Sequence, residues 1–266
     1  MMFYWLLSAA MAGPCHEDGM PAGPVSGSVF DGNLGSARRA CVRDEVGLAQ
    51  SAYLLADAPA FYGHIVAGTV ADLSLTASDD VAIFARLEMI RYDSVISAIS
   101  SSYLGPGHTS VGASYRLLHS DKLAGAVHGQ LVLPTAFGLY RHSWPFAMDA
   151  GFSMQYAISK PFEFHNDVVL LGSGAASLGP TQVRIGAMEH VGIGWRPGRA
   201  FAWVIDARAG FGYRAPLDHV AAATSFRFSD GKRFGFDTTF TVPLAGFERA
   251  LVTADLRATV RLGPMK

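Results

Sequence analysis

Apolar and polar residues alternate along most of the chain with a period of two. The clearest unit is the segment 109–133, in which two alternating runs flank the polar turn 119–121. Successive side chains leave a strand on opposite sides, so this period predicts extended strands. Two such runs joined by a short polar turn predict an antiparallel hairpin.

The same alternation recurs from residue 61 to residue 262. In the runs 201–214 and 249–262, apolar or aromatic residues occupy one face, and Arg, Asp, Gly and Thr occupy most of the other. Short polar turns are expected at 76–80, 119–121, 159–161, 196–199 and 229–232. Longer connections are expected at 93–107, 134–146, 172–181 and 215–223. Short turns that alternate with longer loops are typical of outer-membrane β-barrels.

Strand length points to the same class of protein. Many runs exceed the roughly 5–6 residues common in soluble sheets, and match the roughly 9–11 residues with which a tilted strand crosses a bilayer. The segment 45–56 fits either a short helix or a first strand. Counted as a strand, it gives about 12 strands, with about 10 as the alternative, and an even number returns both chain ends to one side.

Composition leaves two classes of protein open. Of the 266 residues, 50% are hydrophobic and only 16% are charged, against roughly 25% in soluble domains, and the mean hydropathy is +0.24. No run of about 18 apolar residues follows the N-terminus, so no transmembrane helix is predicted. Such a chain is either a large soluble β-protein or a transmembrane barrel. The net charge of −1 gives no indication of a nucleic-acid partner.

Three features favour the barrel. Strand aromatics such as Tyr92, Tyr156 and Phe234 fall near strand ends, where interfacial girdles lie. The polar face is rich in Gly and Ser, which suit the inside of a narrow cylinder, and Lys, common on exposed sheet edges, is scarce. We therefore predict an all-β fold, an antiparallel up-and-down transmembrane β-barrel. Strict alternation turns Glu189 towards lipid, so a bulge or a strand end is expected near Glu189-His190.

The N-terminal part of the chain differs from the strand-rich part. Residues 1–12 are apolar and end in Ala-Met-Ala, as an export signal does, although no Lys or Arg precedes them. Residues 13–44 are rich in Gly, Pro, Ser and Ala and predict a short irregular lead-in. Residues 45–266 are assigned to the barrel.

Two cysteines, Cys15 and Cys41, precede the strand-rich region. In an oxidising periplasm they would close a loop by a disulfide, and the alternative is two unrelated thiols. The sequence also leaves open whether residues 13–60 plug the lumen, hang free or add a strand.

These features together resemble bacterial outer-membrane β-barrel proteins. More narrowly, residues 104–118 and 124–136 are similar to a recurring segment of barrels of the phenol-degradation meta-pathway family. The matching positions are Gly105, Gly107, Tyr115, Arg116, Leu133, Pro134 and Thr135, whereas His108 and Ala136 depart from the family pattern. The resemblance implies a place in the bacterial outer membrane, contact with its lipid, assembly by the barrel-assembly machinery, and uptake of hydrophobic compounds. The C-terminal residues 262–266 lack the final aromatic residue with which many such barrels end.

Motifs for catalysis or cofactor binding are weak. The segment 168–177 begins like a dinucleotide-binding turn, but it lacks the third Gly, and Pro180 argues against the helix that should follow. The chain has no G-x-S-x-G elbow, and its nine His residues lack metal-ligand spacing. We therefore predict no catalytic residues, no cofactor, no metal and no enzyme activity.

The inward face carries the candidate functional residues. They share the polar face of the predicted strands and are expected to line the lumen: Arg86, Glu88, Arg116, Lys122, His128, Gln130, Asp149, Arg184, Asp206, Arg208, Arg214, Asp237, Asp255, Arg257 and Arg261. One interpretation is a pore lining that favours anions. The other is a set of charges that pair with one another and fill a narrow barrel.

We consider three functions for a barrel of this kind. The first is a channel or facilitator for small or hydrophobic molecules, with a small hydrophobic or anionic solute as its partner. The second is a closed barrel with a structural or surface-interaction role and no transport. The third is a lipid hydrolase, which requires Ser and His to converge at the membrane rim; the adjacent pair His142-Ser143 does not indicate this, because neighbouring strand residues diverge.

Overall fold

The computed structural model of the chain describes residues 41–57, 62–96, 101–136, 143–177, 182–198, 200–212, 215–230, 233–246 and 250–262. Within them the chain forms strands joined by turns and loops, as the period of two predicts. No helix in this part of the chain is long and apolar enough to cross a membrane.

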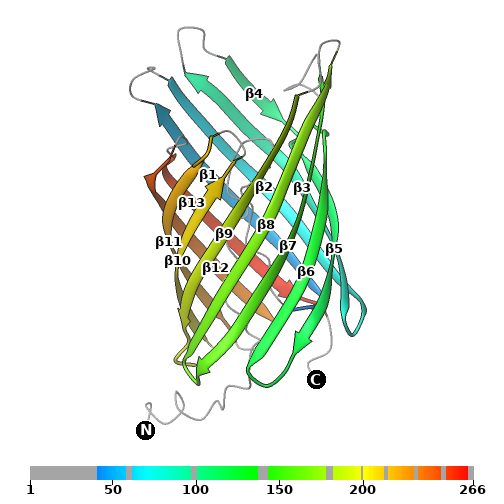
Figure 1. The fold of residues 1–266 in the computed structure, drawn as a ribbon, viewed down its shortest axis with the longest axis vertical. Helices are drawn as coiled ribbons and strands as arrows, with labels where there is room; N and C mark the ends of the chain where they lie inside the picture. The colour runs from blue at the N-terminus through cyan, green and yellow to red at the C-terminus, as the bar shows by residue number, and fades with distance from the viewer. Residues whose placement is uncertain are drawn as a thin grey trace.

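One antiparallel sheet contains all thirteen strands of the described residues: β1 (Glu45–Asp57), β2 (Tyr62–Ser78), β3 (Val81–Ile96), β4 (Ser101–Gly105), β5 (Thr109–His119), β6 (Leu123–Leu133), β7 (Ser143–Ser159), β8 (Phe162–Ser177), β9 (Gln182–Trp195), β10 (Phe201–Phe211), β11 (His219–Ser229), β12 (Phe234–Ala245) and β13 (Ala250–Arg261). β1 pairs with both β2 and β13, and β2 pairs with β3, so the sheet closes on itself. β4 pairs with β3 alone and lies outside the ring. The described strands thus form a closed 12-stranded barrel (Figure 1), and the predicted up-and-down barrel of about 12 strands is confirmed.

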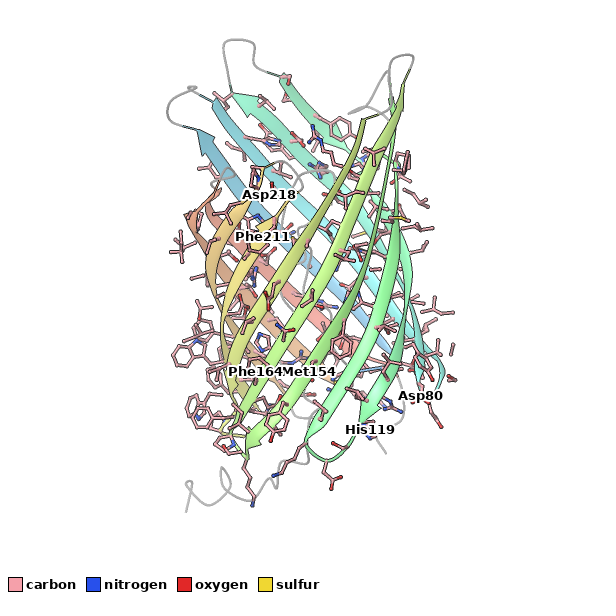
Figure 2. The ribbon with its side chains drawn as sticks, in the orientation of Figure 1. Asp80, His119, Met154, Phe164, Phe211 and Asp218 are labelled. Carbon is pink, nitrogen blue, oxygen red and sulfur yellow. The ribbon has the colours of Figure 1, made fainter. Side chains whose placement is uncertain are left out.

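The barrel has two unlike ends. At the first, which we call the turn end, short turns follow β2, β5, β7, β9 and β11, and β1 begins opposite the last residue of β13, where Glu45 pairs with Arg261. The second, the loop end, carries the longer connections and β4 (Figure 1). Asp80 and His119 lie at the turn end, whereas Phe211 and Asp218 lie at the loop end of their strands (Figure 2). In outer-membrane barrels the short turns face the periplasm.

The pairing between strands tests three local predictions. The segment 45–56, left open between helix and strand, is strand β1. The predicted loop 93–107 is wrong, because β3 runs to Ile96 and β4 then pairs back onto it. The prediction of a bulge or a strand end near Glu189 is also wrong. β9 continues through Glu189 with regular pairing to β8 and β10, and the side chain is exposed on the outer face.

The two faces of the wall have the polarity expected of a membrane barrel. Along β12, Phe236 and Phe240 point outward and are 44% and 43% exposed, whereas Asp237 and Thr239 point inward and are 2% exposed. A soluble sandwich would bury its apolar faces between two packed sheets. The single closed sheet of this chain leaves the apolar face outside, so the sandwich alternative does not fit.

Candidate functional site

Buried polar side chains cover the inside of the wall, and many pair with one another. On β6, β7 and β8, His128 Nε2 lies 3.0 Å from Asp167 Oδ1, and Ser153 Oγ donates to the same oxygen at 2.6 Å. Beside them, Gln130 Nε2 donates to Asp149 Oδ2. All five side chains belong to buried residues, where hydrogen bonds to a carboxylate are strong because water does not compete for them.

Arginines take the corresponding positions on β10 and β11. Arg208 donates from Nε to Asp206 Oδ1 at 2.7 Å and from Nη2 to Asp206 Oδ2 at 3.2 Å, and its Nη1 reaches Thr241 on β12. Arg227 Nη1 lies 3.4 Å from Asp237 Oδ2 on β12. The planar guanidinium suits such fork-like pairing with a carboxylate.

Arg257 on β13 forms an ion-pair cluster across the seam at which the first and last strands meet. Its Nη2 lies 3.1 Å from Glu45 Oε1 on β1 and also bonds to Asp72 Oδ1 on β2. Gly47 on β1 lies between the partners, and a Cβ there would come within 2.9 Å of Arg257 Nε. The absence of a side chain at Gly47 therefore lets Arg257 cross one whole strand.

The same arrangement recurs inside the barrel at Gly151, Gly192 and Gly235. A Cβ at Gly151 on β7 would lie 2.5 Å from the carbonyl oxygen of Val168 and 2.7 Å from His128 Cε1. Interior side chains therefore lie along the wall, over a glycine of the next strand, and reach the strand beyond it. This arrangement explains physically why glycines share the polar face of the predicted strands.

Replacing Gly151 with Ala is expected to lower the free energy of unfolding by about 1–3 kcal/mol, because overpacking displaces either the His128 ring or the β8 backbone. The measurement is a urea titration of protein folded into phospholipid vesicles, followed by tryptophan fluorescence. Gly172→Ala is the matched control, since its nearest contact would be Met148 Cγ at an ordinary 3.7 Å. Equal stability of the two variants would refute the steric role of Gly151.

Residues 41–44 reach the far side of the lumen at the turn end. Cys41 Sγ lies 3.2 Å from Gln155 Oε1 on β7, and Arg43 interacts electrostatically with Glu163 on β8. Arg196, in the turn after β9, lies beside them with its Nη2 3.6 Å from Glu163 Oε1. β7 and β8 stand opposite β1 in the ring of strands. Residues 41–44 therefore cross the turn end of the barrel before β1 begins.

A second cluster lies towards the loop end, where sequence reasoning expected a loop. Arg91 Nη2 lies 2.7 Å from Asp93 Oδ2, and Asp93 Oδ1 lies 2.7 Å from His64 Nε2 on β2. Glu88 accepts a hydrogen bond from the backbone N–H of His108 at 3.0 Å. The contacts of Glu88 hold the chain that leads from β4 into β5 against β3, whereas Asp93 and His64 join β3 to β2.

Seven of the predicted lumen residues are buried on the inward face: His128, Gln130, Asp149, Asp206, Arg208, Asp237 and Asp255. Those that are partly buried are Arg86, Glu88, Arg116, Arg257 and Arg261, and Arg184 is exposed near the loop end of β9. The prediction for Lys122 requires correction, because the residue is exposed in the turn that precedes β6. Arg214 lies outside the described residues.

Two further predictions concern the lumen and the cysteines. The ion pairs of Arg208, Arg227 and Arg257 favour mutual pairing of the inward charges over an anion-selective lining. Cys41 is disulfide-bonded, and Cys15 lies outside the described residues.

Inward residues that were not in the predicted lumen set include Glu45, Asp72, Arg91, Asp93, Ser153, Glu163, Asp167, Arg196 and Arg227. Arg227 did carry a signal, since it alternates with Phe226 and Phe228. Asp167 follows His165 and Asn166 and precedes the unbroken apolar run 168–171, so no clear alternation fixed its phase.

The one set of Ser, His and Asp contacts described inside the barrel does not have the geometry of a catalytic triad. Ser153, Asp167 and His128 meet inside the barrel, with Asp167 between the other two, whereas a catalytic triad places His between Ser and the acid. Ser153 and His128 are also buried in the wall and do not reach the membrane rim. Among the described residues, no group of three or more His, Cys, Asp and Glu side chains has the geometry to hold a metal ion.

Comparisons with known proteins identify the fold. No protein-family model and no curated protein match the chain. Solved structures do match. The translocator domain of the autotransporter NalP from Neisseria meningitidis aligns with a TM-score of 0.59 at 7% identity, covering 84% of this chain and 89% of that one. An outer membrane channel from Pseudomonas putida F1 aligns with a TM-score of 0.57 at 13% identity, covering 84% and 96%. The CymD monoaromatic hydrocarbon channel aligns with a TM-score of 0.51 at 9% identity, covering 92% and 98%.

The fold of this chain is therefore that of the bacterial outer-membrane β-barrel proteins. Identities this low show the fold and leave the function to be argued from the chain itself. The narrower resemblance to the phenol-degradation meta-pathway family is not shown by any family model and stays a prediction.

Proposed function

We propose that the chain is an outer-membrane channel or facilitator for small or hydrophobic molecules. The observation that carries this proposal is the polar inner face, which runs through the wall from Glu163 near the turn end to Arg91 near the loop end. At several glycines its side chains lie along the wall and bridge to neighbouring strands. Two proteins of the same fold are named as an outer membrane channel and a monoaromatic hydrocarbon channel, which supports transport as the function.

Placement in the outer membrane is supported by the outer face. Ring contacts join Trp195, Phe201, Trp203, Phe226 and Phe228 near the turn end, with centroids 5.4–6.4 Å apart. Trp203 Nε1 also donates to Thr224 Oγ1 at 2.8 Å. Aromatic rings with a polar edge gather at the membrane interface, so this cluster fits one girdle of a barrel. Outer-membrane lipid and the barrel-assembly machinery are the partners that this placement implies.

A closed structural or surface-interaction barrel is the second candidate. It is favoured by the low exposure of interior side chains, since Ser153 and Arg208 are only 1% exposed and Asp167 only 2%. Residues 41–44, which cross the turn end, also narrow the opening of the lumen there.

Conductance in planar lipid bilayers distinguishes the two candidates. We expect the purified protein to give small ohmic steps with little preference between K⁺ and Cl⁻, because the inward arginines are paired with carboxylates. Arg43→Ala is expected to raise the step size about twofold, because it removes a side chain that crosses the turn end.

The matched control is Arg116→Ala, which removes an arginine paired with Asp80 at the outer edge of the turn end and should leave the steps unchanged. Absence of any conductance in wild type and in Arg43→Ala would overturn the channel and support the closed barrel. Vesicle uptake of an aromatic hydrocarbon, compared with that of a sugar of similar size, then tests the preference for hydrophobic molecules.

A further inference from the structure

Glu189 places a carboxylate on the lipid-facing side of the wall. It lies near the centre of β9, and the same face of that strand carries Ile185 and Ile193, which are 70% and 54% exposed. In the described strands, Glu189 is the one acidic or basic side chain that the alternation turns outward away from a strand end. A charge in this position is costly in lipid, so such residues generally meet a polar partner.

The neighbouring strand supplies one such partner. Asn166 on β8 donates from Nδ2 to Glu189 Oε1 at 3.2 Å, and the same nitrogen lies 3.4 Å from the carbonyl oxygen of His190. A carboxylate accepts about four hydrogen bonds when it is hydrated. A single amide therefore leaves much of the acceptor capacity of Glu189 directed at the membrane.

The surface on the other side of Glu189 is made of small side chains. Ala209 on β10 is paired with Glu189, Ala207 is the next outward residue of β10, and Ala222 on β11 is paired with Ala207. Small residues let the backbones of membrane segments approach closely, which strengthens packing between them. We define the Glu189 patch as Asn166, Glu189, Ala207, Ala209 and Ala222.

We propose that the Glu189 patch is the surface on which a second copy of this chain docks within the membrane. A twofold axis along the membrane normal keeps every residue at the depth of its equivalent in the other copy. The 3.2 Å contact already puts the donor of Asn166 and the acceptor of Glu189 at nearly the same depth. Asn166 of one copy then donates to Glu189 of the partner subunit, and the reverse contact forms by symmetry. The patch is self-complementary, because the chain itself supplies both the donor and the acceptor.

The test counts subunits by single-molecule photobleaching of labelled protein in phospholipid vesicles. Wild type is expected to bleach in two steps, and Glu189→Leu or Asn166→Leu to associate about tenfold more weakly, since reciprocal hydrogen bonds within the membrane are lost. Glu189→Gln should keep the association, because its amide still accepts a hydrogen bond. Heat-modifiable migration on gels verifies that each variant forms the barrel.

Gln50→Leu is the matched control. Gln50 is another polar residue on the outer face, with Nε2 3.5 Å from Thr69 Oγ1, and its strand β1 lies across the barrel from β9. Dimerisation of Gln50→Leu should equal that of wild type. A wild type that stays monomeric at every protein-to-lipid ratio, or a Gln50→Leu variant as weak as Glu189→Leu, would overturn the proposal.

Mixing the weakly associating variants Glu189→Leu and Asn166→Leu distinguishes loss of the reciprocal contact from a general loss of packing. A Glu189→Leu chain keeps Asn166, and an Asn166→Leu chain keeps Glu189, so the mixed pair retains one of the two reciprocal contacts. Energy transfer between differently labelled chains is therefore expected to be stronger for the mixture than for either variant alone. Equal energy transfer in all three samples would refute the reciprocal contact.

Discussion

Arg257→Met is expected to lower the free energy of unfolding by about 3–5 kcal/mol, because it breaks two ion pairs with carboxylates that are buried or partly buried. The charges in question are Glu45 on β1 and Asp72 on β2, which Arg257 joins across the closing seam. The variant should migrate as the unfolded form at lower urea concentration than wild type. The measurement is heat-modifiable gel migration after incubation in urea, in phospholipid vesicles.

Two companion variants control for the loss of an arginine as such. Arg116 pairs with Asp80 at 2.9 Å, but Asp80 is half exposed, so Arg116→Met should cost about 1 kcal/mol or less. The triple variant Arg257→Met, Glu45→Gln, Asp72→Asn should recover much of the loss, because no buried charge then lacks a partner. If Arg257→Met costs no more than Arg116→Met, the seam ion pairs do not stabilise barrel closure.

Leu170→Arg is expected to destabilise the barrel by about 2–4 kcal/mol, the cost of an arginine on the lipid face near the bilayer midplane. Leu170 lies near the centre of β8, and its side chain is 62% exposed on the outer face, away from the interior. On the surface of a soluble protein, a substitution at such an exposed site would change the stability very little. A urea titration in vesicles therefore tests directly whether this face meets lipid.

Leu217→Arg provides the comparison outside the membrane wall. Leu217 lies in the connection between β10 and β11 at the loop end and is 36% exposed. This variant should have the stability of wild type. Equal stability of Leu170→Arg and Leu217→Arg would contradict the placement of the wall in a bilayer.

Much of the fold was predictable because its signal is local. The period of two along β10, β12 and β13 is imposed by strand geometry and by the different surroundings of the two faces, so each run can be assigned without its neighbours. The short turns after β5 and β7 were predicted for the same reason. The Ser-rich β4 was missed, since a short strand that pairs at the loop end needs no apolar face.

At Glu189 the prediction from the sequence was wrong for a different reason. Sequence reasoning treated a lipid-facing carboxylate as a fault in the phase and expected a bulge to remove it. The regular pairing of β9 keeps the residue outward, beside Asn166. The expectation that charged side chains avoid the lipid-facing side therefore failed at Glu189, the position on which the proposed docking surface depends.

In strands with clear alternation, such as β10, β12 and β13, the sequence by itself determined which side chains face inward and which face outward, because alternation is a property of each strand alone. Only the tertiary structure decided which inward charges meet. Glu45 and Arg257 are separated by 212 positions, and they become neighbours because the first strand closes the barrel against the last. Likewise, the passage of residues 41–44 across the turn end depends on the far wall formed by β7 and β8. Such contacts depend on how the barrel closes and on the register between strands. Neither can be read from the residue pattern of a single strand.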